Sequence, residues 1–158
     1  MYGLGLRSPE VERSKILSEQ IKTSIKYKVG NGLDIDQVID LYRDSTLGER
    51  RPINNRAQMT AMIKNANLII TAWDRSLLVG IARSVSDFSY CTYLSDLAVR
   101  KVYQKKGIGK ELIKRTQIES GKSTTMILLA APAAEEYYPK VGFKHHPQAW
   151  VLGPYNPI

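Results

Sequence analysis

Two glycines in a basic stretch of the chain have the spacing of an anion-binding helix start. Gly107 and Gly109 follow Lys105 and Lys106 and open a segment of helical periodicity that continues to about Ser120. The first turn of a helix leaves about four backbone N–H groups unpaired and carries about half a positive charge. Glycine lets ligand oxygen atoms approach this backbone closely, and the lysines add full charges. The segment therefore predicts a site for a phosphate group.

Two common phosphate-binding motifs do not fit this part of the chain. The dinucleotide-binding fingerprint would need a third glycine at position 112, which is Leu112 here, and it follows the first strand of a βαβ unit. A Walker-type loop would need a glycine five residues before Gly121, where this chain has Thr116, and the segment there leads from a helix into a strand. Both motifs are therefore excluded.

The glycine-bearing segment and a second segment nearer the C-terminus together form a more specific pattern. Residues 104–109, Gln-Lys-Lys-Gly-Ile-Gly, follow a predicted strand that ends in Leu-Ala-Val at residues 97–99. Residues 133–143 read Ala-Ala-Glu-Glu-Tyr-Tyr-Pro-Lys-Val-Gly-Phe. Together the two segments resemble the acyl-CoA pyrophosphate loop and the aromatic-Tyr-x-x-x-Gly-Phe helix of the GCN5-related N-acetyltransferase (GNAT) family. The resemblance covers residues 21–152 and leaves the first twenty residues unexplained.

The resemblance implies an enzyme that uses acetyl-CoA as its cosubstrate. In this family two neighbouring strands splay apart, the pantetheine arm bonds to strand backbone in the gap, and the pyrophosphate rests on the amides of the glycine-bearing loop. Carried over to this chain, the residues expected to bind the cosubstrate are Leu97, Ala98, Val99, Gln104, Lys105, Lys106, Gly107, Ile108, Gly109 and Lys110.

The resemblance also implies direct transfer of the acetyl group from a thioester to an amine, which raises two proton problems. An alkyl ammonium with a pKa of about 10.4 is only about one part in two thousand neutral at pH 7, so its proton must be accepted. The departing thiolate must be protonated or stabilised, and Tyr138, four residues before Gly142, is the expected general acid or thiolate stabiliser. Proton transfer from a phenol to a thiolate runs uphill by about 2 kcal/mol, which hydrogen bonding in the site can offset.

The acceptor side of the implied site carries no strong base. The strand positions where some relatives have glutamate or histidine are Tyr93 and Ser95, so a water chain held by these residues is the expected proton acceptor. Alternation along the strand points Asp96 to the opposite face. The loop between the first two helices carries Arg50 and Arg51, which attract a carboxylate-bearing acceptor or are simply solvated. The resemblance leaves a small-molecule amine, a protein lysine and a protein N-terminus open as the acceptor.

The spacing of apolar residues predicts the elements that hold these residues in place. The predicted strands span residues 21–29, 68–73, 77–85, 90–99, 125–130 and 150–152, and the predicted helices span residues 35–48, 59–66, 107–120 and 133–141. The run at 125–130 is continuously apolar, as in a central strand covered on both faces. This order predicts an α+β fold, and the resemblance makes it a mixed, mostly antiparallel sheet with splayed central strands and flanking helices.

Length and composition favour one soluble domain. The chain has 158 residues, of which 43% are hydrophobic and 24% charged, and its longest nearly apolar stretch is nine residues, too short to span a membrane. We expect an arm over residues 1–20 and a single domain over residues 21–158. One cysteine and no secretion-signal pattern favour the cytoplasm and leave no cysteine-based zinc site, so we expect no metal. Cys91 itself is expected to be a small buried hydrophobe.

The net charge of +8 is concentrated between residues 100 and 122, where eight basic residues stand against two acidic ones. This concentration favours one polyanionic ligand, and a solvated helix face is its ordinary alternative. A non-catalytic acyl-CoA sensor and a basic nucleic-acid-binding module are the alternatives to the enzyme. A nucleic-acid-binding module would need exposed aromatic residues among the basic ones, so nucleic acid is not an expected partner. A membrane is not an expected partner either. Dimers are common in the family that the chain resembles, so a homodimer is compatible with the sequence.

Overall fold

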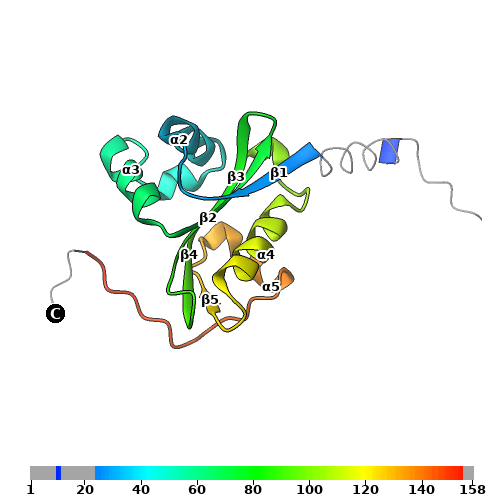
Figure 1. Cartoon of the computed structure of the whole chain (residues 1–158). Helices are drawn as coiled ribbons and strands as arrows, with labels where there is room; N and C mark the ends of the chain where they lie inside the picture. The colour runs from blue at the N-terminus through cyan, green and yellow to red at the C-terminus, as the bar shows by residue number, and fades with distance from the viewer. Residues whose placement is uncertain (1–9, 12–23, 155–158) are drawn as a thin grey trace, which may run out of the picture. The chain divides into compact units, whose positions relative to one another are not determined.

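The described part of the chain divides into two compact units. The structure is a computed structural model and describes residues 10–11 and 24–154 (Figure 1). The first unit ends at Leu128, and the second begins at Leu129. Apart from residues 10 and 11, the expected arm over residues 1–20 lies outside the described residues, and the expected single domain stays a prediction.

A five-stranded sheet forms the centre of the first unit (Figure 1). Its strands are, in spatial order, β1 (Ile25–Val29), β2 (Leu68–Asp74), β3 (Leu77–Ser86), β4 (Cys91–Val99) and β5 (Thr125–Ile127). The first four strands are antiparallel neighbours, and β5 runs parallel to β4. The sheet is therefore mixed and mostly antiparallel, which confirms the predicted fold class.

Helices cover both faces of this sheet. They are α2 (Ile35–Asp44), α3 (Arg56–Asn65) and α4 (Ile108–Ser120). The first two lie on one face and α4 lies on the other (Figure 1). Val38, Tyr42 and Met59 are fully buried, and they belong to the same hydrophobic cluster as Leu78 and Ile81 of β3. This cluster is the core between the helix pair and the sheet.

Local signals set where α2 ends and α3 begins. The helix predicted over residues 35–48 ends at Asp44, because Thr46 has a left-handed φ of 72° that an α-helix cannot continue. A short 3-10 helix, η1 (Leu47–Arg50), follows. Asn55 then accepts the backbone N–H of Gln58 at 3.0 Å and caps α3.

Close packing at Gly80 sets the position of α4 on the sheet. A Cβ at Gly80 would lie 3.1 Å from Cδ1 of Leu112 and 3.3 Å from Cγ2 of Ile108. Glycine therefore allows the first turns of α4 to rest directly on β3. The start of the helix is held by packing as well as by its local sequence.

The strands β4 and β5 part soon after they meet. Their parallel pairing joins residues 91–93 of β4 to the three residues of β5. Beyond that point, residues 94–99 of β4 have no strand partner on this edge within the described part of the chain. This edge is named here the open edge of β4.

Three expectations for this end of the sheet and for its cysteine are wrong. β5 has three residues instead of the predicted six, and Ile127 is 50% exposed, so the strand is not covered on both faces. No strand forms at residues 150–152, and Trp150 is exposed. Cys91 is exposed as well, because it opens β4 at the margin of the sheet. Apolar composition leads to burial only where a partner surface exists.

The second unit is short and mostly irregular. It contains a 3-10 helix, η3 (Pro132–Ala134), and α5 (Tyr137–Lys140), so the helix predicted over residues 133–141 is broken into two pieces. Gly142 has a left-handed φ of 103°, and the N–H of Phe143 donates to the carbonyl oxygen of Tyr138 at 3.1 Å. The chain therefore turns back directly after α5.

Candidate active site

The start of α4 has the free backbone donors that the sequence predicts. Gly107 precedes the helix with a left-handed φ of 84°, and its carbonyl oxygen accepts the N–H of Glu111 at 3.0 Å. Among the described residues, the N–H groups of residues 105–110 have no protein acceptor. The positive end of the dipole of a 13-residue helix lies at the same place. We name residues 104–110 the cradle, because their free amides can hold an anion.

The three lysines of the cradle differ in their contacts. Nζ of Lys106 donates to the carbonyl oxygen of Val102 at 2.6 Å and lies 5.3 Å from the centre of the Tyr103 ring. Its charge is therefore held back in the preceding loop. Lys105 and Lys110 are exposed and form no ion pair with any other residue that the structure describes.

The open edge of β4 leads into the cradle. The N–H of Arg100 donates to the carbonyl oxygen of Val79 in β3, so alternation turns the backbone groups of Val99 and Leu97 toward the open edge. There the carbonyl oxygen of Val99 accepts the side-chain amide of Gln104 at 2.9 Å. Gln104 thus ties the cradle to the end of the strand. The N–H of Val99 and both backbone groups of Leu97 are left to face a ligand.

Two of the predicted cosubstrate residues have core side chains. Ala98 is 3% exposed and belongs to the main hydrophobic cluster, and Ile108 is 2% exposed beneath the first turn of α4. Their side chains are turned into the protein, so any contribution to binding would come from their backbone atoms. The remaining residues of the predicted set line the open edge and the cradle.

A buried carboxylate with no expected role, Asp96, joins α2, η1 and the following loop residue to β3 and β4. Asp96 is 1% exposed and accepts hydrogen bonds from the hydroxyl of Tyr42 at 2.7 Å and from Nε of both Arg51 and Arg83 at 2.5 Å. Nη2 of Arg51 also donates to the carbonyl oxygen of Ser95, and Nη2 of Arg83 donates to its hydroxyl, both at 2.7 Å. These five residues are named here the Asp96 network.

The network shifts the acidity of its members. Burial raises the pKa of Tyr42 well above its ordinary value, and the charge of Asp96 and its hydrogen bond raise it further. Burial alone would lower the pKa of Arg83, but the hydrogen bond and charge of Asp96 outweigh it and the pKa is raised. The phenol is therefore neutral and the guanidinium charged. Two arginines around one carboxylate leave a net positive charge.

The residues predicted for the acceptor side have more definite roles than expected. Arg51 is partly exposed but not free, because the Asp96 network uses its guanidinium; Arg50 is exposed, and its carbonyl oxygen accepts Nη1 of Arg51 at 2.8 Å. Tyr93 is 38% exposed at the open edge. The hydroxyl of Ser95 accepts Nη2 of Arg83, which leaves its proton and one lone pair for the expected water chain.

A sequence signal for the network existed. Arg83 and Asp96 are the charged residues of β3 and β4 and stand at buried positions, where a charge needs a partner. Their pairing across β3 and β4 could be inferred from the hairpin register. The contribution of Tyr42 and Arg51 could not, because it depends on how α2 and η1 pack on the sheet.

Tyr138 lies in the second unit, on α5, as the resemblance implies. Its ring makes edge-to-face contacts with Tyr137 at 5.4 Å and Phe143 at 5.5 Å between ring centres. Both Tyr137 and Tyr138 are partly buried, and burial raises the pKa of Tyr137.

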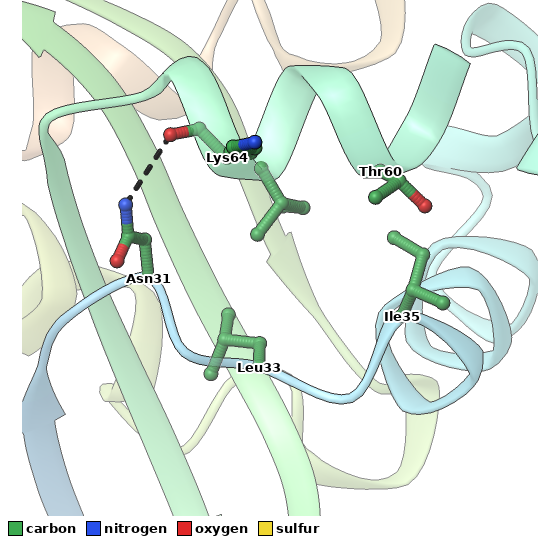
Figure 2. Close-up of a pocket in the computed structure, with 6 residues that line it drawn as sticks. Asn31, Leu33, Ile35, Thr60 and Lys64 are labelled. Carbon is green, nitrogen blue, oxygen red and sulfur yellow. Dashed lines mark hydrogen bonds between the residues drawn. The ribbon is translucent and has the colours of Figure 1, made fainter. Parts of the chain in front are cut away.

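A small pocket forms a separate feature of the first unit (Figure 2). It has a volume of about 150 Å³ and is lined by Asn31, Leu33, Ile35, Thr60, Ile63 and Lys64. The side-chain amide of Asn31 donates to the carbonyl oxygen of Lys64 at 3.3 Å, which joins the loop after β1 to α3. None of the lining residues belongs to the cradle or to the Asp96 network.

In residues 10–11 and 24–154, no three His, Cys, Asp or Glu side chains are grouped so that they could hold a metal ion. None of the helices in that part of the chain is long and apolar enough to cross a bilayer.

Comparison with known proteins identifies the family. Residues 42–150, more than half of the chain, match the family model described as "Acetyltransferase (GNAT) domain". The chain is similar to the "Uncharacterized N-acetyltransferase ycf52" of Pyropia yezoensis, with 29% identity over 126 residues, which are 73% of this chain and 71% of that protein.

Solved structures show the same fold. A GNAT family acetyltransferase from Streptococcus pneumoniae TIGR4 superimposes with a TM-score of 0.60 and 21% identity over 81% of this chain and 98% of that one. The aminoglycoside N-acetyltransferase AAC(6')-Iy in complex with CoA superimposes with a TM-score of 0.64 and 14% identity over 83% of this chain and 95% of that one. The expected fold and the expected enzyme class, an acetyl-CoA-dependent N-acetyltransferase, are confirmed. By its match to the family model over residues 42–150, this chain belongs to the GNAT acetyltransferase family.

Proposed function

We propose that the protein transfers an acetyl group from acetyl-CoA directly to a primary amine, with the diphosphate of the cosubstrate held by the cradle. The observation that carries this proposal is the row of free N–H groups at residues 105–110, directly beyond the open edge of β4. A diphosphate needs several donors at one place, and a helix start supplies them without the cost of ordering side chains.

The strand edge suits the rest of the cosubstrate. A pantetheine arm carries two amides, and the free backbone groups of Leu97 and Val99 offer them complementary donors and an acceptor. Gln104 holds the strand end and the cradle together, so the two halves of the proposed site keep one geometry. A protein with the same fold, AAC(6')-Iy, forms a complex with CoA, which supports CoA as the ligand.

The proposed reaction has one chemical step. The amine nitrogen attacks the thioester carbonyl carbon, and the C–S bond breaks as the C–N bond forms. The hydroxyl of Tyr138 gives its proton to the departing sulfur or stabilises the thiolate by a hydrogen bond. Because neither Tyr93 nor Ser95 is a base at neutral pH, the ammonium proton leaves through water bound at these residues. The role of Tyr138 rests on the sequence resemblance.

The acceptor is a primary amine, and an assay of a panel with several classes of amine identifies which class it belongs to. The chain is similar in fold to an aminoglycoside N-acetyltransferase, so kanamycin belongs in that panel. Spermidine, L-leucine, tyramine and a lysine-containing peptide represent the other classes of amine.

We expect the protein to act in the cytoplasm.

Titration calorimetry followed by a transfer assay tests the proposal. CoA is expected to bind at least about tenfold more tightly than pantetheine, which lacks the diphosphate. Equal affinity, or no heat with CoA, would contradict the cradle. The panel amines are then assayed for release of free CoA thiol from acetyl-CoA. Binding without transfer to any amine would indicate a non-catalytic acyl-CoA sensor. Binding of duplex DNA at physiological salt would favour the nucleic-acid alternative.

A further inference from the structure

The loop between α2 and α3 is stiff within itself. We name residues 45–55 the η1 loop. The N–H of Ile53 donates to the carbonyl oxygen of Arg51 at 2.8 Å, and Gly48 is packed so closely that a Cβ there would lie 2.9 Å from Cδ1 of Ile53. A loop with this internal support moves as one piece, so one strong anchor fixes it.

Arg51 is the anchor that joins this loop to the sheet. Its Nε donates to the carboxylate of Asp96 at 2.5 Å, and its Nη2 donates to the carbonyl oxygen of Ser95 at 2.7 Å. The guanidinium therefore donates two hydrogen bonds, like a fork, to Ser95 and Asp96, which are consecutive residues of β4. A lysine cannot reproduce such a fork, because its ammonium is a single point charge.

The anchor grips β4 at an irregular point. Arg83 pairs with Asp96 and Ser84 pairs with Leu94, so Ser95 is an extra residue that forms a bulge. Arg83 holds the hydroxyl of this residue, and Arg51 holds its carbonyl oxygen. The bulge lies within the open edge of β4, where residues 94–99 have no strand partner in the described sheet.

We propose that Arg51 and Asp96 are positioning residues that set where the amine acceptor stands, by fastening the η1 loop to the bulge at Ser95. The inference rests on the proposed function, since it takes the thioester to lie along the open edge of β4. Groups fixed at this edge then define the approach of the amine. Neither residue touches the reacting atoms, but a displacement of about 1 Å in the acceptor can cost about a hundredfold in rate.

The exposure of the partners identifies Arg51 as the residue to replace. The side chain of Arg51 is 21% exposed, against 8% for Arg83 and 0% for Asp96. Removing Arg51 leaves Asp96 paired with Arg83 and Tyr42, so no buried charge is left without a partner. Replacing Asp96 would leave two arginines without their anion and endanger the fold itself.

Steady-state kinetics of Arg51→Ala and Arg51→Lys test the proposal, with the panel amine that the wild type uses at the highest kcat/KM. Arg51→Ala is expected to lower kcat/KM for that amine by about tenfold or more and to leave the Kd for acetyl-CoA within about twofold. Arg51→Lys keeps the charge and should recover part of the loss. The matched control is Arg56→Ala, which removes an arginine paired with Asp36 at 2.9 Å on the exposed surface of α2 and α3.

The possible outcomes separate the positioning role of Arg51 from the proposed function. An unchanged kcat/KM for the amine in folded Arg51→Ala, or an equal loss of acetyl-CoA affinity, overturns the positioning role. If Arg51→Ala does not fold, the kcat/KM of Arg51→Lys decides, and a wild-type value overturns the proposal. Failure of the wild type to bind CoA or to acetylate any panel amine removes the proposed function, whereas wild-type transfer with an unaffected Arg51 variant removes this inference alone.

Discussion

Gly80 of β3 and Leu112 of α4 are so close that a methyl group on residue 80 would lie 3.1 Å from Cδ1 of Leu112. The same methyl group would lie 3.3 Å from Ile108, the first residue of α4. The packing of the sheet and the position of the free amides at the cradle are therefore coupled. A change far from any ligand atom can move the helix start that is proposed to hold the diphosphate.

Gly80→Ala tests this coupling. The added methyl group crowds Leu112 and Ile108, which must shift by a few tenths of an ångström. This is expected to lower the free energy of unfolding by about 1–3 kcal/mol and to weaken CoA binding. Urea denaturation and calorimetry measure the two effects. Gly32→Ala is the matched control, because no atom lies within 4 Å of a Cβ there. CoA affinity that stays at the wild-type value in Gly80→Ala would separate the packing from the cradle.

The backbone of Gly107 gives a second prediction. Its φ of 84° costs an alanine about 1–2 kcal/mol, whereas asparagine adopts this conformation more readily. Gly107→Ala is therefore expected to weaken CoA binding more than Gly107→Asn does. Calorimetry with CoA measures both variants, and the reverse order would show that space rather than backbone conformation governs the position.

The phenol of Tyr42 makes stability depend on alkaline pH. Its pKa is raised by burial and by Asp96, so its contribution is fully present below pH 10.0, the ordinary value, and is lost as the pH rises toward the folded-state pKa. At pH 8, Tyr42→Phe is expected to be less stable than the wild type by about 1.5–3 kcal/mol, the range for a hydrogen bond to a charged group.

Urea denaturation between pH 8 and pH 11 checks this dependence. The difference between wild type and Tyr42→Phe should shrink above pH 10, since only the wild type loses the contribution of this phenol. Tyr90, which is 77% exposed, provides the control variant Tyr90→Phe. A constant difference across the whole range would mean that the phenol of Tyr42 does not titrate as described.

Tyr138→Phe tests the proposed acid. Removing a general acid typically lowers the rate by about 10²–10⁴-fold, so kcat should fall by at least about a hundredfold while the Kd for CoA changes little. The control is Tyr137→Phe, which changes the neighbouring ring 5.4 Å away and should keep most of the activity. Equal kcat in Tyr138→Phe and the wild type would exclude this tyrosine from the reaction.

The cradle was predictable because its chemistry is local. A helix start with two glycines and flanking lysines depends on residues 105–110 and on the first turn that follows them, and the structure reproduces it with free amides. The strands β2 and β3 were predictable for the same reason, whereas α3 starts at Arg56, three residues before the predicted start. The open edge of β4 came from the resemblance, which linked the strand to the loop after it.

The remaining features depend on contacts between distant parts of the chain. Tyr42, Arg51, Arg83 and Asp96 come from α2, the η1 loop and two strands, and no local pattern states that they meet at one carboxylate. The exposure of β5 and Trp150 was missed because apolar residues are buried only when another element covers them. Local hydrogen bonding could thus be inferred from the order of residues, whereas the partners of buried charges and the cover of apolar strands follow from packing across the whole unit.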